Sequence, residues 1–169
     1  MRISNILFLA VILCLFSLIV VPPYLAGLGY GLPLDFSFRV FERYCHQLPE
    51  RTLTVSGHKM PVCARCFGIY LGMLIGALTF PYASKGKAPP GWVLIALAVP
   101  MALDGVSQLV GLRTSTNGLR VVTGFLFGFA IPFYLVPVID DILAPCGTWL
   151  ERFYTPPRIT LHKSRKRRG

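Results

Sequence analysis

Residues 45–70 read CHQLPERTLTVSGHKMPVCARCFGIY and hold three of the five cysteines and two of the three histidines of the chain. An apolar run follows directly. The CxxC motif, Cys63 to Cys66, would lie on the first turn of a helix built from that run, where unpaired backbone N–H groups and the positive end of the helix dipole favour thiolate over thiol. This stretch therefore predicts a helix that enters a membrane with reactive sulfur at its start.

The composition is that of a small integral membrane protein. The chain has 169 residues, of which 54% are hydrophobic and 14% are charged, which is too apolar for an ordinary soluble domain. Runs close to the ~20 residues that cross a bilayer lie at 6–21, 67–83, 91–112 and 119–139. We therefore expect an all-α protein with four transmembrane helices. They would form one domain, residues 1–148, followed by a basic tail, residues 149–169. The first run could also serve as a signal peptide, but a poor cleavage site follows it.

Basic residues predict the orientation in the membrane. Ten of the 17 lysines and arginines fall on the side of the termini, and seven fall in the other two loops. By the positive-inside rule both termini are cytoplasmic, in a multi-pass protein of the cytoplasmic membrane with its long loop, residues 26–60, outside. The tail segment KSRKRR, residues 163–168, could touch anionic lipid or nucleic acid. We expect it to be a topology signal that contacts the bilayer, with no specific nucleic-acid partner.

Two features of the helices and the loop predict packing. The first span should end at Pro22-Pro23, and residues 35–44, DFSFRVFERY, should form a short helix in the membrane interface, anchored by aromatic residues such as Phe41. Glycines recur at four-residue intervals in the second span, residues 68–76, and again at Gly124 and Gly128. Such stripes allow helices to approach closely. If they pack together, the two helices run parallel and the CxxC motif lies beside the start of the fourth span.

Polar residues at the end of span three and the start of span four predict a second part of the site. Asp104 and Gln108 share one helix face at i and i+4, and an acid inside a span is a functional candidate, although Asp104 could instead reach the headgroup layer. Ser115 or Thr116 could cap the fourth span.

A set of cationic and amide side chains around this region could bind an anion. Guanidinium groups match phosphate and carboxylate, and helix N-termini bind phosphate. A phosphate-bearing, lipid-linked small molecule is therefore the expected substrate. Alternatively, the arginines pair nonspecifically with lipid or with nearby carboxylates. The predicted substrate-binding residues are Arg51, Arg65, Arg113, Asn117 and Arg120.

Three cysteines and one histidine form a common tetrahedral zinc set. The predicted ligands of zinc or a similar divalent metal are Cys45, Cys63, Cys66 and His58. His46 is the alternative, but it is adjacent to Cys45, so His58 is geometrically freer to reach the ion. With three protein ligands the ion would keep an open, catalytic position.

Catalytic roles then fall to the remaining polar groups. Asp104 or His46 could act as acid or base, with Gln108 on the same helix face as Asp104. The function expected from these residues is a metal-dependent enzyme that acts on an anionic, lipid-linked substrate.

Two other classes of function remain open. The CxxC motif with Arg65 between its cysteines has features that depress a thiol pKa, and the layout is similar to that of the quinone-linked, disulfide-generating membrane enzymes of bacteria. Those enzymes have a second cysteine pair in the other outer loop, which residues 113–120 lack. The third class is a non-catalytic membrane module in which a metal site or a disulfide braces the loop.

The joint motifs also resemble a family of small prokaryotic membrane proteins, the domain of unknown function 2085 family. The resemblance spans about residues 41–128. It implies that the scattered polar residues form one site, and it implies no particular substrate or reaction. The motifs that carry it are Cys45-His46-Gln47, Cys63-Ala64-Arg65-Cys66 with Gly68 and Gly72, Asp104-Gly105 with Gln108, and Ser115-Thr116-Asn117 with Arg120, Thr123 and Gly124.

Overall fold

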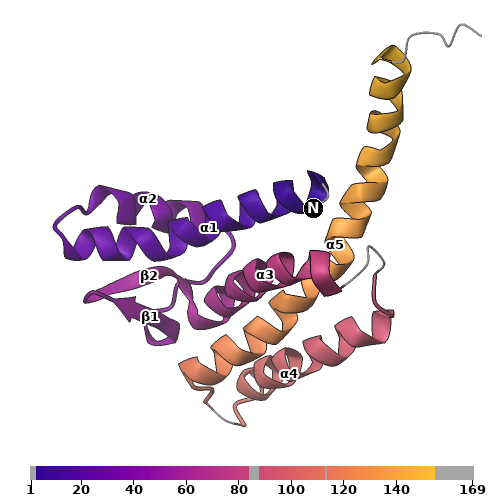
Figure 1. Cartoon of the computed structure of the whole chain (residues 1–169). Helices are drawn as coiled ribbons and strands as arrows, with labels where there is room; N and C mark the ends of the chain where they lie inside the picture. Colours follow the sequence, from indigo (N-terminus) through magenta and orange to yellow (C-terminus); the bar gives the residue numbers. More distant parts are fainter. Residues whose placement is uncertain (1–2, 84–87, 113, 155–169) are drawn as a thin grey trace, which may run out of the picture.

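A computed structural model describes residues 3–83, 88–112 and 114–154, with side chains as far as residue 143. In this part of the chain four helices are long and apolar enough to cross a membrane. They are α1 (Ile3–Gly27), α3 (Ala64–Ala83), α4 (Gly91–Leu109) and α5 (Asn117–Tyr154), of which the apolar part of α5 ends at Leu143 (Figure 1). The predicted four-helix membrane protein is confirmed at this level. The orientation of the termini and the division into domain and tail stay predictions.

The segment between α1 and α3 is folded, in contrast to the long loop expected there. It contains α2 (Leu32–Phe41), the 3-10 turn η1 (Pro49–Arg51), and an antiparallel hairpin of β1 (Thr52–Val55) and β2 (His58–Cys63). The β-branched residues of TLTV favour a strand. Ser56 and Gly57, at the turn, both have positive φ, 50° and 80°, as a type I′ hairpin turn requires.

Helix α1 does not end at Pro22-Pro23, and this prediction is wrong. The helix continues to Gly27, and both prolines are buried. Membrane helices tolerate interior proline where neighbouring elements cover the interrupted backbone, and here α2 and the hairpin pack along this end of α1 (Figure 1). Gly27 ends the helix against the hairpin turn, where a Cβ atom would lie 2.7 Å from the Cβ of Ser56.

Helices α3 and α5 form the closest pair, and their glycines make this contact. A Cβ atom on Gly68 would meet the carbonyl oxygen of Val121, and one on Gly76 would meet that of Phe129. From the other side, a Cβ atom on Gly124 would meet the carbonyl oxygen of Arg65. Residue numbers increase together along both helices, so α3 and α5 run parallel. The packing predicted from the glycine stripes is confirmed.

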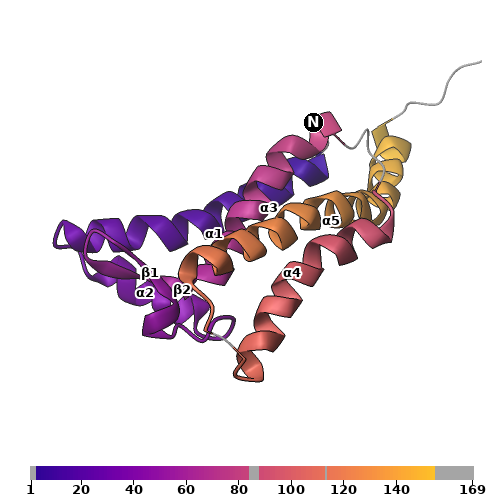
Figure 2. The same cartoon turned by 90° about the horizontal axis from the view of Figure 1, so that it is seen from below.

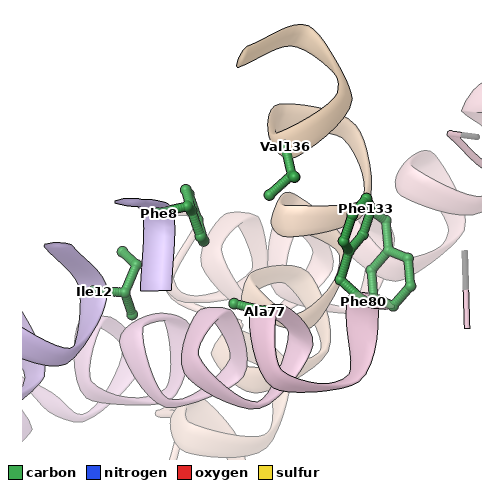
Figure 3. Packing of buried hydrophobic residues seen from close by; sticks show 6 residues of the cluster. All are labelled: Phe8, Ile12, Ala77, Phe80, Phe133 and Val136. Carbon is green, nitrogen blue, oxygen red and sulfur yellow. The ribbon is translucent and has the colours of Figure 1, made fainter. Parts of the chain in front are cut away.

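Two apolar clusters hold the helices together. One joins α1, α3 and α5 (Figure 3), where the rings of Phe80 and Phe133 meet edge to face with centroids 5.8 Å apart. Its buried members are Phe8, Ile12, Ala77, Phe80, Phe133 and Val136. The second lies at the hairpin end and includes Phe41, which is 1% exposed and packs edge-on against Tyr70. Phe41 is therefore a core residue and not the interfacial anchor that its position in DFSFRVFERY suggested.

Helix α4 packs chiefly against α5 (Figure 2), and its buried residue is Asp104. At its start, the hydroxyl of Tyr134 donates to the carbonyl oxygen of Pro90 at 2.9 Å and accepts from the backbone N–H of Leu94 at 3.2 Å. This satisfies one of the N–H groups that a helix N-terminus leaves without an intrahelical partner. Tyr134 thus fixes one end of α4, and Asp104 lies toward the other.

Candidate metal centre and its polar network

The CxxC motif lies across a junction between strand and helix. Cys63 is the last residue of β2, and Ala64, which is fully buried, is the first residue of α3. Cys66 therefore falls in the first turn of α3, as the sequence predicted. Strand β2 thus holds Cys63, and the first turn of α3 holds Cys66.

Cys45 reaches the same place from the end of α2. Its backbone N–H donates to the carbonyl oxygen of Phe41 at 2.9 Å, which continues the last turn of the helix. Its Sγ atom accepts a hydrogen bond from the backbone N–H of Cys63 at 3.1 Å. Hydrogen bonds of this kind, made to the atom that would bind a metal, orient a ligand and tune the site. Cys45 is 6% exposed, so it is largely shielded from solvent.

Gln47 positions the segment that carries Cys45, a role that was not predicted from the sequence. Its Nε2 atom donates to the carbonyl oxygen of Phe38 at 2.8 Å and to that of Pro61 at 2.9 Å, which joins α2 to β2. Its φ of 48° is unusual for a residue with a side chain. The glutamine of CHQ, two residues from a candidate ligand, was the available signal.

The sulfur atoms of Cys45, Cys63 and Cys66 all lie within 4.8 Å of one another. Three thiolates at the usual Zn–S distance of about 2.3 Å in tetrahedral geometry would lie about 3.8 Å apart, so the group fits an ion after a small contraction. Hydrogen bonds from the Cys45 and Cys66 side chains hold the pKa of the Cys63 thiol far below its usual value of 9.0. Cys63 is thus favoured as the thiolate, the form that binds a metal or attacks a disulfide.

The structure does not bring His58 to these sulfurs. His58 begins β2, opposite Val55 at the hairpin turn, and Cys63 ends the same strand. Five residues of extended strand separate them by about 16 Å. His46 is exposed beside Cys45 and also lies outside the group of mutually close ligand atoms found among the described residues. Within the part of the chain whose side chains are described, three ligands therefore come together and a fourth position is left.

Asp104 is connected to the CxxC motif through Arg65. The Arg65 guanidinium forms an ion pair with the Asp104 carboxylate, whose Oδ2 atom also accepts from Nε2 of Gln108 at 2.9 Å. Asp104 is 4% exposed, and a buried acid inside a span requires such partners. The Arg65 side chain lies over Gly105, where a Cβ atom would be 3.8 Å from its Nη1 atom. A single guanidinium thus connects α3 to α4 beside the cysteines.

The network continues through Arg120, which is buried at 7% exposure. Its guanidinium donates to Oε1 of Gln108 and to Oδ1 of Asn117, both at 2.9 Å. Asn117 in turn donates to the carbonyl oxygen of Glu50 in η1 at 3.4 Å. Thr116 caps α5, as predicted, by accepting the backbone N–H of Leu119 at 3.4 Å. Four elements therefore meet at this network.

Several charged groups of both signs lie close together in this region. Arg51, Arg65, Asp104 and Cys63 are all close enough to Arg120 to act on it electrostatically. Arg51 is exposed, whereas Arg65 and Arg120 are partly or fully shielded. Arg113, the remaining predicted anion-binding residue, lies outside the described residues.

These features define a small multi-pass membrane protein with a three-cysteine cluster beside a buried polar network. The chain belongs to the family described as "Predicted membrane protein (DUF2085)", whose model matches residues 45–134. The match begins at the first cysteine of the cluster and ends at Tyr134, which fixes the start of α4. It therefore covers every residue of the cluster and of the network.

Two archaeal relatives are similar over the same region. "Uncharacterized protein MJ1492" of Methanocaldococcus jannaschii is 47% identical over 109 residues, which are 63% of this chain and 70% of the relative. An "Uncharacterized protein" of Methanothermobacter thermautotrophicus is 42% identical over 93 residues, which are 54% of this chain and 83% of the relative. No solved structure matches the chain.

Proposed function

We propose that this protein is a metal-dependent membrane enzyme that acts on an anionic, lipid-linked substrate. The observation that carries the proposal is the placement of three cysteine sulfurs within 4.8 Å of one another, next to an arginine that connects them to a buried acid in a neighbouring span. The proposed ligands are Cys45, Cys63 and Cys66, and the proposed ion is zinc or a similar divalent metal.

The three ligands support a catalytic site more than a purely structural one. Structural zinc sites have four protein ligands, whereas catalytic sites have three and keep a position for water or a substrate oxygen. His46 is the nearest histidine in sequence, exposed beside Cys45. It stays our candidate for proton transfer at the open position.

The charge of the network supports an anionic substrate. Arg120 donates to two neutral amide oxygens, while Asp104 and Cys63 act on its charge from nearby. A phosphate would compensate that charge and match the guanidinium geometry. We propose that Asp104 and Gln108 hold Arg65 and Arg120 in place for this anion, with Asp104 the alternative acid or base.

A second candidate function is thiol–disulfide exchange, favoured by the low pKa of Cys63 beside Cys66. In that reaction the two thiols form a disulfide and lose two electrons and two protons to an acceptor of the quinone class. The two functions place different demands on the same sulfurs, since a metal holds them as thiolates and exchange cycles them through disulfides.

Lipid binding and turnover test the favoured function. Full-length protein in mild detergent is incubated with phosphatidic acid, with and without chelator, and the retained and converted lipid is measured by mass spectrometry. We expect phosphatidic acid to be retained over phosphatidylcholine, and its conversion to require the metal. Arg120→Gln should reduce retention several-fold because it removes the buried cation.

Lys59→Gln is the matched control, since Lys59 is an exposed cation on the hairpin away from the network. Arg120→Lys keeps the charge and should retain more lipid than Arg120→Gln. Equal retention by Arg120→Gln and Lys59→Gln would contradict the anion site. Conversion that is unaffected by chelator would contradict the metal-dependent enzyme.

A further inference from the structure

A cavity opens between α4 and α5 directly beside the polar network. It has a volume of about 370 Å³, and both helices belong to the set that is able to cross a membrane. The cavity is lined by Pro100, Leu103, Asp104, Ser107, Leu119 and Thr123. The hydrogen-bonded network contributed by α3, α4 and α5 therefore has an open, mostly apolar space at its edge.

Along α4 the cavity lining passes from a polar end to an apolar end, whereas on α5 the apolar Leu119 lies nearer the start of the helix than Thr123. Asp104, which pairs with Arg65, and Ser107 lie toward the C-terminal end of α4, the end at which the network lies. Pro100 lies about one turn deeper than Asp104 along α4, and Leu103 directly precedes Asp104. On α5, Thr123 lies one turn after the buried Arg120. The space thus begins beside the Arg65–Asp104 pair and extends along both helices toward the middle of the spans.

The apolar end is accessible from outside the helix pair. Leu103 is 66% exposed, and its neighbours on the outer face of α4 are also exposed apolar residues. In a membrane these surfaces face hydrocarbon. A molecule that enters from the bilayer would therefore meet apolar walls and, at the network, the Arg65–Asp104 ion pair with the buried Arg120 next to it.

We propose that this cavity holds one hydrocarbon chain of an anionic lipid whose phosphate binds at Arg65 and Arg120. The inference rests on the proposed function and names the part of the substrate that the α4–α5 pair recognises. The guanidinium groups beside the cavity select the phosphate, and the apolar walls select a chain over a free anion. Helix α4 becomes a substrate-binding element that is secured by Tyr134 at one end and Asp104 at the other.

Photolabelling tests the position of the chain. The probe is phosphatidic acid with a photoactivatable diazirine in one acyl chain, added to full-length protein in phosphatidylcholine nanodiscs. We expect labelled peptides to contain Leu103, Leu119 or Thr123. Leu103→Trp places an indole at the entrance and should lower this labelling roughly tenfold, as expected for loss of a well-packed binding contact. Labelling at other surfaces, or labelling unchanged by Leu103→Trp, would overturn the proposal.

Val106→Trp is the matched control, because Val106 is similarly exposed on α4, at 57%, and does not line the cavity. It should label as the unmodified protein does.

Excess inorganic phosphate should compete only weakly if the chain contributes to binding. Full competition would identify free phosphate as the ligand and contradict the chain site. Metal content is measured on the same samples. Cavity labelling without metal would contradict the proposed enzyme and leave the chain site standing, whereas metal without cavity labelling would do the reverse.

Discussion

Gln47 joins α2 to β2 with one amide group, and this bridge presents Cys45 to the other two cysteines. Replacing it with alanine removes both hydrogen bonds and leaves the carbonyl oxygens of Phe38 and Pro61 without that donor. We expect Gln47→Ala to lower the free energy of unfolding by about 1–3 kcal/mol and to weaken metal binding. Thermal unfolding in detergent and metal titration measure the two effects. A variant with unchanged metal affinity would show that Gln47 does not position Cys45.

Replacement of Asn5, in contrast, should stabilise the protein. Its side-chain amide is buried, at 1% exposure, and both polar atoms lack a hydrogen-bond partner among the described residues. A buried polar group without partners costs about 1–3 kcal/mol, and an apolar group of similar shape avoids that cost. We expect Asn5→Leu to raise the melting temperature. Ser4→Ala is the control, since equally buried Ser4 bonds to Asp140, and it should lower the melting temperature. A destabilised Asn5→Leu protein would indicate that Asn5 has a partner.

Residue chemistry predicted much of the site, and local geometry explains where it did not. The Thr116 cap and the face shared by Asp104 and Gln108 follow from spacing along a helix, which the sequence encodes directly, and the cysteines follow from their ligand chemistry. His58 was misjudged because its distance from Cys63 depends on an extended strand rather than a free loop. The partner of Arg65 depends on a contact between helices far apart in sequence.

At the scale of elements, the close contact of α3 with α5 depends on the absence of side chains at five glycines. Gly72 faces the carbonyl oxygen of Phe125 and the backbone of Gly128 and Phe129. We expect Gly72→Ala to separate the helices and destabilise the protein by about 1–3 kcal/mol.

Gly118→Ala is the matched control on α5, because a Cβ atom there meets no atom within 4 Å. Relief of the backbone entropy of glycine should stabilise this variant by up to about 1 kcal/mol. Melting temperatures of the two alanine variants in detergent should therefore shift in opposite directions. Equal shifts would mean that the glycine stripe is not the limiting contact.

The helices were predictable because a span needs about 20 apolar residues, and length and composition carry that signal. The glycine stripes further predicted which two helices pack and in which direction. The hairpin was not predicted, although TLTV, Ser-Gly and HKMPVC form its strands and turn. The cysteines and histidines of this segment indicated a metal-binding loop instead. The end of α1 was misplaced because buried neighbours, which are distant in sequence, allow the helix to continue through two prolines.

For the whole molecule, the excess of basic residues predicts that both termini are cytoplasmic. Reporter fusions after Gly86, which lies outside the described residues, and at the C-terminus should both give cytoplasmic signals. The parallel α3 and α5 begin at the same face, so the cysteines and the network would then be extracytoplasmic. An extracytoplasmic signal from either fusion would place the cysteines in the reducing compartment.

The state of the three clustered cysteines tests the central claim most directly. Protein purified in mild detergent without chelator is analysed for metals, and its thiols are alkylated in parallel with and without reductant. We predict about one zinc-like ion per chain, by the ligand chemistry of three thiolates. Cys45→Ser, Cys63→Ser and Cys66→Ser should each lose most of the metal, whereas Cys14→Ser, at an exposed cysteine in α1, and His58→Ala should keep it. A metal-free protein in which Cys63 and Cys66 resist alkylation until reductant is added would contradict the metal site and establish a disulfide in its place.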